Sequence, residues 1–220
     1  MKKTLLLTII LLCSSCSILF HNHFERKSAN YELQDLWVAA TLDYNDNVKY
    51  LVNTTQENYV ANHTDFYNEY VLNFFRDEFK NQSYSKVNYK DNNGKTLIPF
   101  TLDYELSQEY INNLKQITDL DYIVLTKILN ANQINNSNDL QYNNLKYKSN
   151  VLAGSVVFFK IIDIINNRKV IELRCKSAVY DNPKFNFNTN SYEDDNKIAL
   201  YTNEEQLIKK CSKRIFRRIK

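Results

Sequence analysis

The stretch from Val151 to Tyr180 constrains the fold more than any other part of the chain. It consists of two β-rich runs with a short polar segment between them. Asparagine tolerates the left-handed backbone of a tight turn, so Asn166 and Asn167 in that segment predict a β-hairpin. The first run is apolar on both faces, which predicts a central strand covered on both sides. The second run alternates apolar and charged residues, and its inward face carries Ile171, Leu173 and Cys175.

The rest of the chain supplies the other elements of one α/β domain. Helical spacing predicts helices over residues 64–81 and 106–117 and a last helix from Thr202, which forms a capping box with Glu205. Apolar runs predict further strands over residues 36–44, 48–52, 86–89, 121–130 and 197–201. A chain of 220 residues suits one well-buried domain rather than two. We therefore predict an α/β (α+β) fold over residues 36–220, in which about five strands form a single mixed sheet and three helices pack on it.

The amino terminus has the layout of a secretory signal. Two lysines precede an apolar segment, residues 4–12, which the run Cys13-Ser14-Ser15-Cys16 follows. The segment is too short to span a bilayer comfortably. This end of the leader resembles a bacterial lipobox, in which small residues precede a cysteine that is lipidated. The resemblance implies that residues 1–15 are removed and that Cys16 carries lipid, and an ordinary cleaved signal and an uncleaved anchor are the alternatives.

A lipidated Cys16 implies export and tethering to a membrane, because each buried methylene contributes about 0.8 kcal/mol. Ser17 follows with no acidic run behind it, which resembles outer-membrane sorting toward the periplasm. Residues 16–35 are expected to form the lipidated tether. The predicted partners are the membrane, through Cys16, and an envelope protein, whereas nucleic acid is excluded by export.

The scarcity of glycine excludes several enzyme classes. The chain has two glycines, Gly94 and Gly154, which lie far apart. A Rossmann fingerprint, a P-loop and a nucleophile elbow each need two or more glycines a few residues apart, because the backbone must approach phosphate or bend sharply. No cofactor is therefore expected. The histidines and cysteines form no metal-ligand motif, so no metal is expected either, and His63 is predicted to be a surface residue beside a helix start.

Acidic pairs are the candidates for catalysis, and they are Asp119 with Asp121 and Asp194 with Asp195. Acids in loops and at strand edges are mostly solvated, so we predict no catalytic residue and no enzymatic activity. Two cysteines, Cys175 and Cys211, are expected to face the core. An oxidising periplasm would join them in a disulfide. The alternative is a pair of buried free thiols that pack as small hydrophobes.

The predicted last helix is strongly basic. From Leu207 to the end the chain has seven cations and no acid. Such a cluster attracts an acidic protein surface, anionic lipid or glycan, and salt weakens the attraction. The plainer alternative is the solvated outer face of a core helix. The candidate contact residues are Lys209, Lys210, Lys213, Arg214, Arg217 and Arg218.

Two segments resemble a superfamily of exported proteins. In the first, Asp121-Tyr122 introduces an apolar strand after a helix, and in the second Ile162-Asp163-Ile164 precedes a turn. Over residues 119–129 and 156–170 the pattern resembles the superfamily that includes the lipoprotein activators of penicillin-binding proteins, the curli-secretion lipoprotein and the amino-terminal domain of the Tol translocation β-propeller protein. The resemblance implies an exported domain and assigns no functional residue.

Three functions follow as hypotheses. The first is a non-enzymatic outer-membrane lipoprotein that faces the periplasm and docks on, or regulates, an envelope complex for cell-wall synthesis or export. The second is a periplasmic ligand- or glycan-binding lipoprotein with an aromatic-lined pocket, for which the candidates are Tyr142, Tyr147 and Tyr192. The third is a hydrolase, which requires carboxylates from distant segments to cluster.

Overall fold

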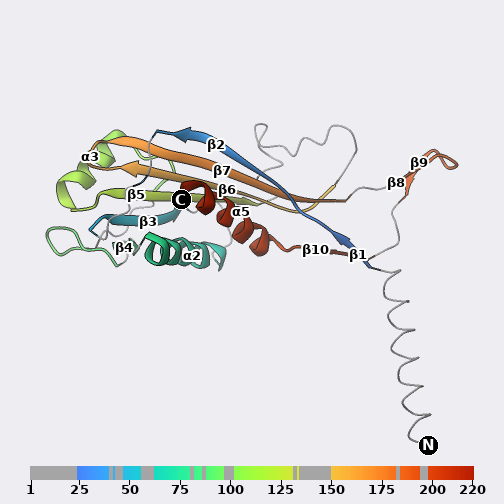
Figure 1. The fold of residues 1–220 in the computed structure, drawn as a ribbon, viewed down its shortest axis with the longest axis horizontal. Coiled ribbons are helices and arrows are strands. Elements are labelled where there is room, and N and C mark those ends of the chain that lie inside the picture. Colours follow the sequence, from blue (N-terminus) through green and yellow to red (C-terminus); the bar gives the residue numbers. More distant parts are fainter. Residues whose placement is uncertain are drawn as a thin grey trace, which may run out of the picture.

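The computed structural model describes residues 24–39, 42, 47–55, 62–79, 82–85, 88–96, 102–130, 133, 150–181, 184–193 and 198–220. In this part of the chain, three helices pack on a six-stranded mixed sheet, and two small two-stranded sheets accompany it. The α/β class and the three helices match the prediction, but the main sheet has six strands rather than about five (Figure 1). None of the described helices has the length and apolar character needed to cross a membrane.

The centre of the main sheet is the predicted hairpin. Strand β6 (Asn150–Asp163) lies between β5 (Tyr122–Asn130) and β7 (Arg168–Asp181) and is antiparallel to both. Its apolar side chains are largely buried on both faces, as the pattern predicted. In the turn, Asp163 accepts hydrogen bonds from the backbone and side-chain nitrogens of Asn166, at 2.9 and 2.7 Å. Asn167 takes the left-handed backbone, with φ 51°.

The strand order of the main sheet is β2-β7-β6-β5-β3-β4. β3 (Lys49–Thr55) is parallel to β5 and to β4 (Gln82–Ser85), and β2 (Asn30–Val38) forms the other edge, antiparallel to β7. The short strand expected over residues 48–52 is therefore a buried inner strand. Of the strand expected over residues 86–89, residues 86 and 87 lie outside the described residues, and residues 88 and 89 are not in a strand, so the expectation is wrong for this half.

Helices cover both faces of the main sheet. α2 (Asn62–Phe79) and α5 (Glu204–Ile219) share one apolar cluster with β3, β5, β6 and β7, whereas α3 (Gln108–Ile117) packs on a second cluster with β3 and β5. The apolar face of the last helix is buried. Its cap is Asn203, which accepts a hydrogen bond from the Gln206 amide at 2.9 Å, so the capping box expected at Thr202 is wrong by one residue.

The two small sheets lie toward one end of the long axis of the molecule (Figure 1). β1 (Phe24–Lys27) pairs in parallel with β10 (Ile198–Tyr201), and β8 (Lys184–Asn186) pairs antiparallel with β9 (Ser191–Glu193). The described part of the tether expected over residues 16–35 is thus mostly strand. The strand expected over residues 36–44 begins six residues earlier and ends at Val38, because the preceding apolar side chains of β2 pack against the core.

Candidate functional site

The edge strand β2 consists of two unlike parts. The first part interacts with the core and with neighbouring charged residues. Along residues 30–35 the apolar side chains pack against the core cluster under α5. The acids of this part are paired: Glu32 lies 3.3 Å from the ammonium of Lys176, and Asp35 lies 2.6 Å from the guanidinium of Arg218. Charged side chains, here held in ion pairs, disfavour the pairing of an edge strand with another chain.

The second part, Leu36, Trp37 and Val38, is named here the open end of β2. These residues are 42%, 50% and 48% exposed. A bulge at Leu36 interrupts the pairing with β7. Since β2 is an edge strand among the described residues, the open end presents large apolar side chains beside a backbone edge that has no neighbouring strand. Adjacent exposed apolar side chains mark interaction surfaces.

Trp37 is held firmly although half of it is exposed. Its indole Nε1–H donates to the carbonyl oxygen of Lys169 at 3.2 Å, and the Lys169 ammonium lies 5.4 Å from the ring centroid. The Ala39 amide donates to the carbonyl oxygen of Val170 at 2.8 Å, which keeps the chain against β7 beyond the end of the strand. In register, Trp37 lies opposite Glu172. A surface fixed in this way loses little conformational entropy when it binds a partner.

A network of charges around the buried ammonium of Lys160 supports the strands behind the open end. The Glu172 carboxylate accepts hydrogen bonds from Lys169 at 2.6 Å and from the Tyr104 hydroxyl at 3.2 Å. Lys160, buried in β6, places its ammonium 3.5 Å from Glu172 and 2.7 Å from Glu105. The same ammonium lies 4.1 Å from the centroid of the Tyr104 ring. The network therefore joins β6, β7 and the segment before α3.

The electrostatics of this network favour its charged form. Burial disfavours the charge of Glu172, but the hydrogen bond from Lys169 and the charge of Lys160 outweigh burial and hold the pKa of Glu172 below its ordinary value. Burial, and next the charge of Glu172, raise the pKa of Tyr104, so its hydroxyl stays protonated and donates. Because these charges are paired with one another, the network suits a supporting role.

The structure divides the predicted basic contact residues of α5 into two sets. In the first set, Lys209 pairs with Glu205 at 2.8 Å, Arg214 lies 4.6 Å from the centroid of the Tyr31 ring, and Arg218 pairs with Asp35. Arg214 and Arg218 thus join α5 to β2, whereas the ion pair of Lys209 lies within α5. The second set, named here the basic stripe, is exposed and forms no ion pair among the described residues. Its spacing of i, i+3 and i+7 places it on one helix face, and it comprises Lys210, Lys213 and Arg217.

Cys175 and Cys211 meet between β7 and α5. Both are buried free thiols, and the Cys211 Sγ–H donates to the carbonyl oxygen of Cys175 at 3.4 Å. The hydrogen bond with Cys211 and burial raise the pKa of Cys175. The inward direction predicted for both side chains is confirmed, and of the two alternatives the structure has the free thiols. Cys16 lies outside the described residues, so its lipidation stays a prediction.

The candidate acids Asp119 and Asp121 bind other parts of the chain. Asp119 accepts hydrogen bonds from the side chains of Lys49 and Tyr89, and Asp121 accepts one from the Lys49 amide at 2.8 Å. The hydrogen bonds from Lys49 and Tyr89 lower the pKa of Asp119. Burial, together with the hydrogen bond to Asp119, raises the pKa of Tyr89 to about 12. These acids therefore link the starts of β3 and β5.

The remaining catalytic and metal-binding candidates form no cluster of side chains within the described ranges. Asp194 and Asp195 lie outside them, and His63 is in the first turn of α2. No group of three or more residues able to hold a metal ion occurs among the residues that the structure describes.

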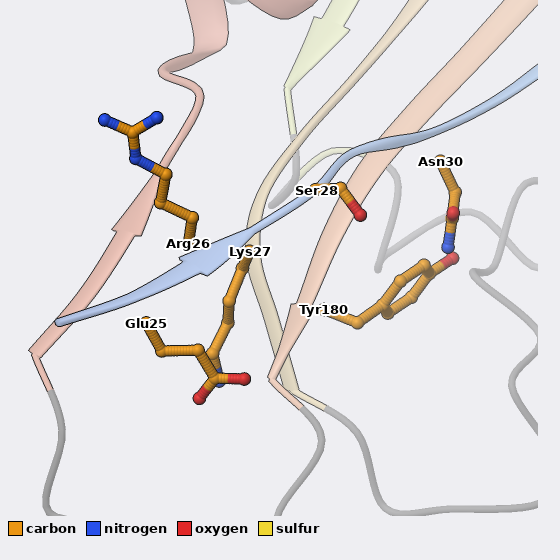
Figure 2. Close-up of a pocket in the computed structure, with 6 residues that line it drawn as sticks. All are labelled: Glu25, Arg26, Lys27, Ser28, Asn30 and Tyr180. Carbon is orange, nitrogen blue, oxygen red and sulfur yellow. The ribbon is translucent and has the colours of Figure 1, made fainter. Parts of the chain in front are cut away.

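A polar hollow of about 310 Å³ lies where β1 meets the end of β7. Figure 2 shows Arg26 pointing to the β10 side of β1, whereas Glu25 and Lys27 lie on the other side, and the side chains of Asn30 and Tyr180 approach each other. Lys27 also pairs with Asp181. The aromatic pocket expected from Tyr142, Tyr147 and Tyr192 stays a prediction, because the first two lie outside the described residues; Tyr192 is on β9.

No family model and no curated protein matches the chain. Among solved structures, the PelC dodecamer from Paraburkholderia phytofirmans has a TM-score of 0.35 and 11% identity, over 69% of this chain and 82% of the other. A putative neuraminyllactose-binding hemagglutinin homolog from Helicobacter pylori has a TM-score of 0.31 and 8% identity, over 80% of this chain and 82% of the other. At these scores neither protein informs the function, and the resemblance to the exported superfamily stays a prediction.

Sequence reasoning missed two features that now stand out. It predicted a strand through Trp37 but not that the end of the strand is exposed on a sheet edge. It also passed over Lys160, the one charged residue inside the apolar run of β6. Because a buried lysine is almost always paired, its position could have predicted an acidic partner, which is Glu172.

Proposed function

We propose that this protein is a non-enzymatic lipoprotein of the outer membrane, facing the periplasm, and that it docks on an envelope protein through the open end of β2. The observation that carries the proposal is the contrast within β2, where paired charges protect residues 30–35 and three adjacent apolar side chains leave the end exposed. The leader before Cys16 supports the location.

The docking mode is addition of a partner strand or apolar segment to the edge of the sheet. An edge strand offers backbone groups at regular spacing, and Leu36, Trp37 and Val38 supply the apolar contacts that give such pairing its affinity. Tryptophan is the residue type most enriched among those that dominate binding energy. The hydrogen bond from the Trp37 indole to the Lys169 carbonyl oxygen fixes the ring, so the docking surface is already ordered before a partner binds.

The basic stripe supports an acidic partner. Arg218 pairs with Asp35, the residue before the open end, so the last turn of α5 lies close to this surface. Arg217 in the same turn is exposed and belongs to the stripe. A partner that covers the open end and carries acidic residues at its rim would reach these cations, which act mainly on association rate and salt dependence.

The test is co-purification from membranes with a matched pair of variants. Leu36→Asn with Val38→Thr removes the apolar character of the open end, and Ile165→Ser removes a similarly exposed apolar side chain, 51% exposed, from the β6–β7 turn. We expect the wild type and Ile165→Ser to retain the envelope partner and the double variant to lose it. Recovery of the wild-type chain as a lone monomer after crosslinking would contradict the proposal.

The membrane anchor is tested separately by the mass of the mature protein. We expect the chain to begin at Cys16 with acyl chains attached and to fractionate with the outer membrane, and Cys16→Ala to abolish both. A mature protein that keeps residues 1–15 and stays in the cytosol would contradict the location but not the docking surface.

A second candidate function, ligand binding, is favoured by the polar hollow between β1 and β7. Lysine, glutamate, asparagine and tyrosine side chains converge there, which suits a small polar or glycan ligand. A rise in melting temperature with cell-wall fragments that Tyr180→Phe and Asn30→Ala abolish would support it. No shift in the wild type would leave docking as the proposed function.

A further inference from the structure

Exposed apolar side chains are concentrated at the end of the molecule that carries the small sheets. Of the ten exposed large hydrophobic residues in the described chain, five lie on these sheets and a sixth, Phe187, lies in the turn between β8 and β9. This group, named here the aromatic end, comprises Phe185, Phe187, Tyr192, Ile198, Leu200 and Tyr201. Both small sheets lie toward the same end of the long axis (Figure 1).

The β8–β9 hairpin forms an ordered aromatic platform. Phe185 lies 5.1 Å from Tyr192 and 5.2 Å from Phe187, measured between ring centroids, and both pairs are edge-on. Phe187 is 88% exposed. Asn190 closes the turn with a left-handed backbone, φ 50°. A two-stranded sheet alone is marginally stable in water, so exposed rings on such a sheet indicate that another surface covers them.

The β1–β10 pair adds an apolar contribution at the same end. Ile198 is 61% exposed, and Leu200 and Tyr201 are also exposed. β1 begins at Phe24, eight residues after Cys16, and eight residues span at most about 28 Å when extended. A lipid anchor on Cys16 therefore restricts this end of the molecule to the neighbourhood of the bilayer.

We propose that the aromatic end inserts its exposed side chains into the interfacial zone of a phospholipid bilayer beside the anchor, an inference that rests on the lipidated Cys16 of the proposed function. Aromatic rings with polar neighbours are the side chains that favour this zone.

The hairpin carries one cation and one acid, Lys184 and Glu193. In β1, Lys27 pairs with Asp181, and Glu25 and Arg26 have opposite charges. The charges of this end thus balance, so the proposed contact is apolar in origin and requires no anionic lipid. The anchor would hold the chain at the membrane, and the hairpin contact would fix the orientation of the domain on it.

In this orientation the open end of β2 faces away from the membrane. β2 runs from the small sheets toward the opposite end of the molecule (Figure 1). At about 3.3 Å per residue, Trp37 lies about 23 Å along the strand from Asn30. The surface proposed to dock a partner would thus project into the periplasm.

The test uses tryptophan fluorescence of the lipidated full chain in phosphatidylcholine vesicles that contain brominated acyl chains. The chain has one tryptophan, so the wild type reports on position 37 and the double variant Phe187→Trp, Trp37→Phe reports on position 187. Flotation with the vesicles confirms attachment in both. We expect bromine to quench position 187 severalfold more strongly than position 37, with no change when phosphatidylglycerol or salt is added.

Equal quenching at the two positions, or none at position 187 in chains that float, would overturn the inference and indicate that a protein or a second copy covers the aromatic end. Failure of the wild type to float would overturn the anchor and, with it, this inference. The co-purification that depends on Leu36 and Val38 is independent of both outcomes, so the docking proposal is judged separately.

Discussion

The two parts of β2 differ in how their side chains are used. Residues 30–35 are tied down by the core and by the ion pairs of Glu32 and Asp35, whereas Leu36, Trp37 and Val38 have exposed faces. Both parts belong to one edge strand paired with β7. The difference shows that exposure at the open end does not follow from its place on the edge, because Glu32 and Asp35 on the same edge are paired. This contrast is the basis of the docking proposal.

The largest expected effect comes from the charges that support this strand from behind. Lys160→Ala removes a buried ammonium together with its pairs to Glu105 and to the half-buried Glu172, which keeps its hydrogen bonds from Lys169 and Tyr104. We therefore expect the loss in the free energy of unfolding to lie at the low end of the range for breaking a buried ion pair, about 3 kcal/mol. Urea denaturation measures the change. Lys213→Ala, in the basic stripe, is the matched control and should leave the unfolding midpoint unchanged, and equal effects of the two variants would contradict the distinction between paired and unpaired lysines.

The second effect separates the two parts of β2 directly. Leu33→Ala removes core contacts and should lower the free energy of unfolding by about 2 kcal/mol. Leu36→Ala removes an exposed side chain and should cost about 0.5 kcal/mol or less. Both variants replace a leucine of β2 by alanine. Urea denaturation of the two variants therefore compares the two parts of the strand for the same substitution. A larger loss for Leu36→Ala would show that the open end is structural.

The third effect concerns acid stability. The pKa of Glu172 is lower in the folded protein than its ordinary value of 4.5, so the folded state binds fewer protons than the unfolded state. Its contribution to stability is complete above pH 4.5 and is lost as the pH falls through the folded pKa. Urea midpoints measured from about pH 7 to about pH 3 should fall more steeply for the wild type than for Glu172→Gln. Parallel profiles would contradict the charged network.

The smallest effect on stability is expected for the basic stripe. Replacing Lys210, Lys213 and Arg217 by glutamine should change the free energy of unfolding by about 0.5 kcal/mol or less, because these side chains are exposed and form no ion pair with the residues that the structure describes. The same variant should weaken partner association and reduce its dependence on salt. Unchanged association at low salt would exclude the stripe from the docking surface.

The sequence predicted the centre of this fold well and its margins poorly. The β6–β7 hairpin followed from the two apolar runs and from Asn167, because burial on both faces leaves a continuous pattern. β2 was placed too late because an edge strand alternates with polar residues, so its first half was assigned to the tether. β8 and β9 are three residues each and rich in polar residues, which hides them in a loop pattern.

The candidate site was predicted only in outline. The basic character of α5 was evident, but which cations are free depends on partners such as Asp35, 183 residues from Arg218 in the chain. Likewise, the inward direction of Cys175 and Cys211 followed from periodicity, whereas their contact depends on how α5 crosses β7. The sequence gives the type of each side chain, whereas the exposure of a side chain depends on its neighbours in the folded structure.

The most direct test of the account is photo-crosslinking in living cells at position 37. A photoreactive amino acid replaces Trp37 in one strain and Ile165 in another, and mass spectrometry identifies the adducts. We expect position 37 to give one dominant envelope protein that position 165 does not give. Adducts at position 165 alone, or the same adducts at both positions, would contradict the claim that the open end of β2 is the docking surface.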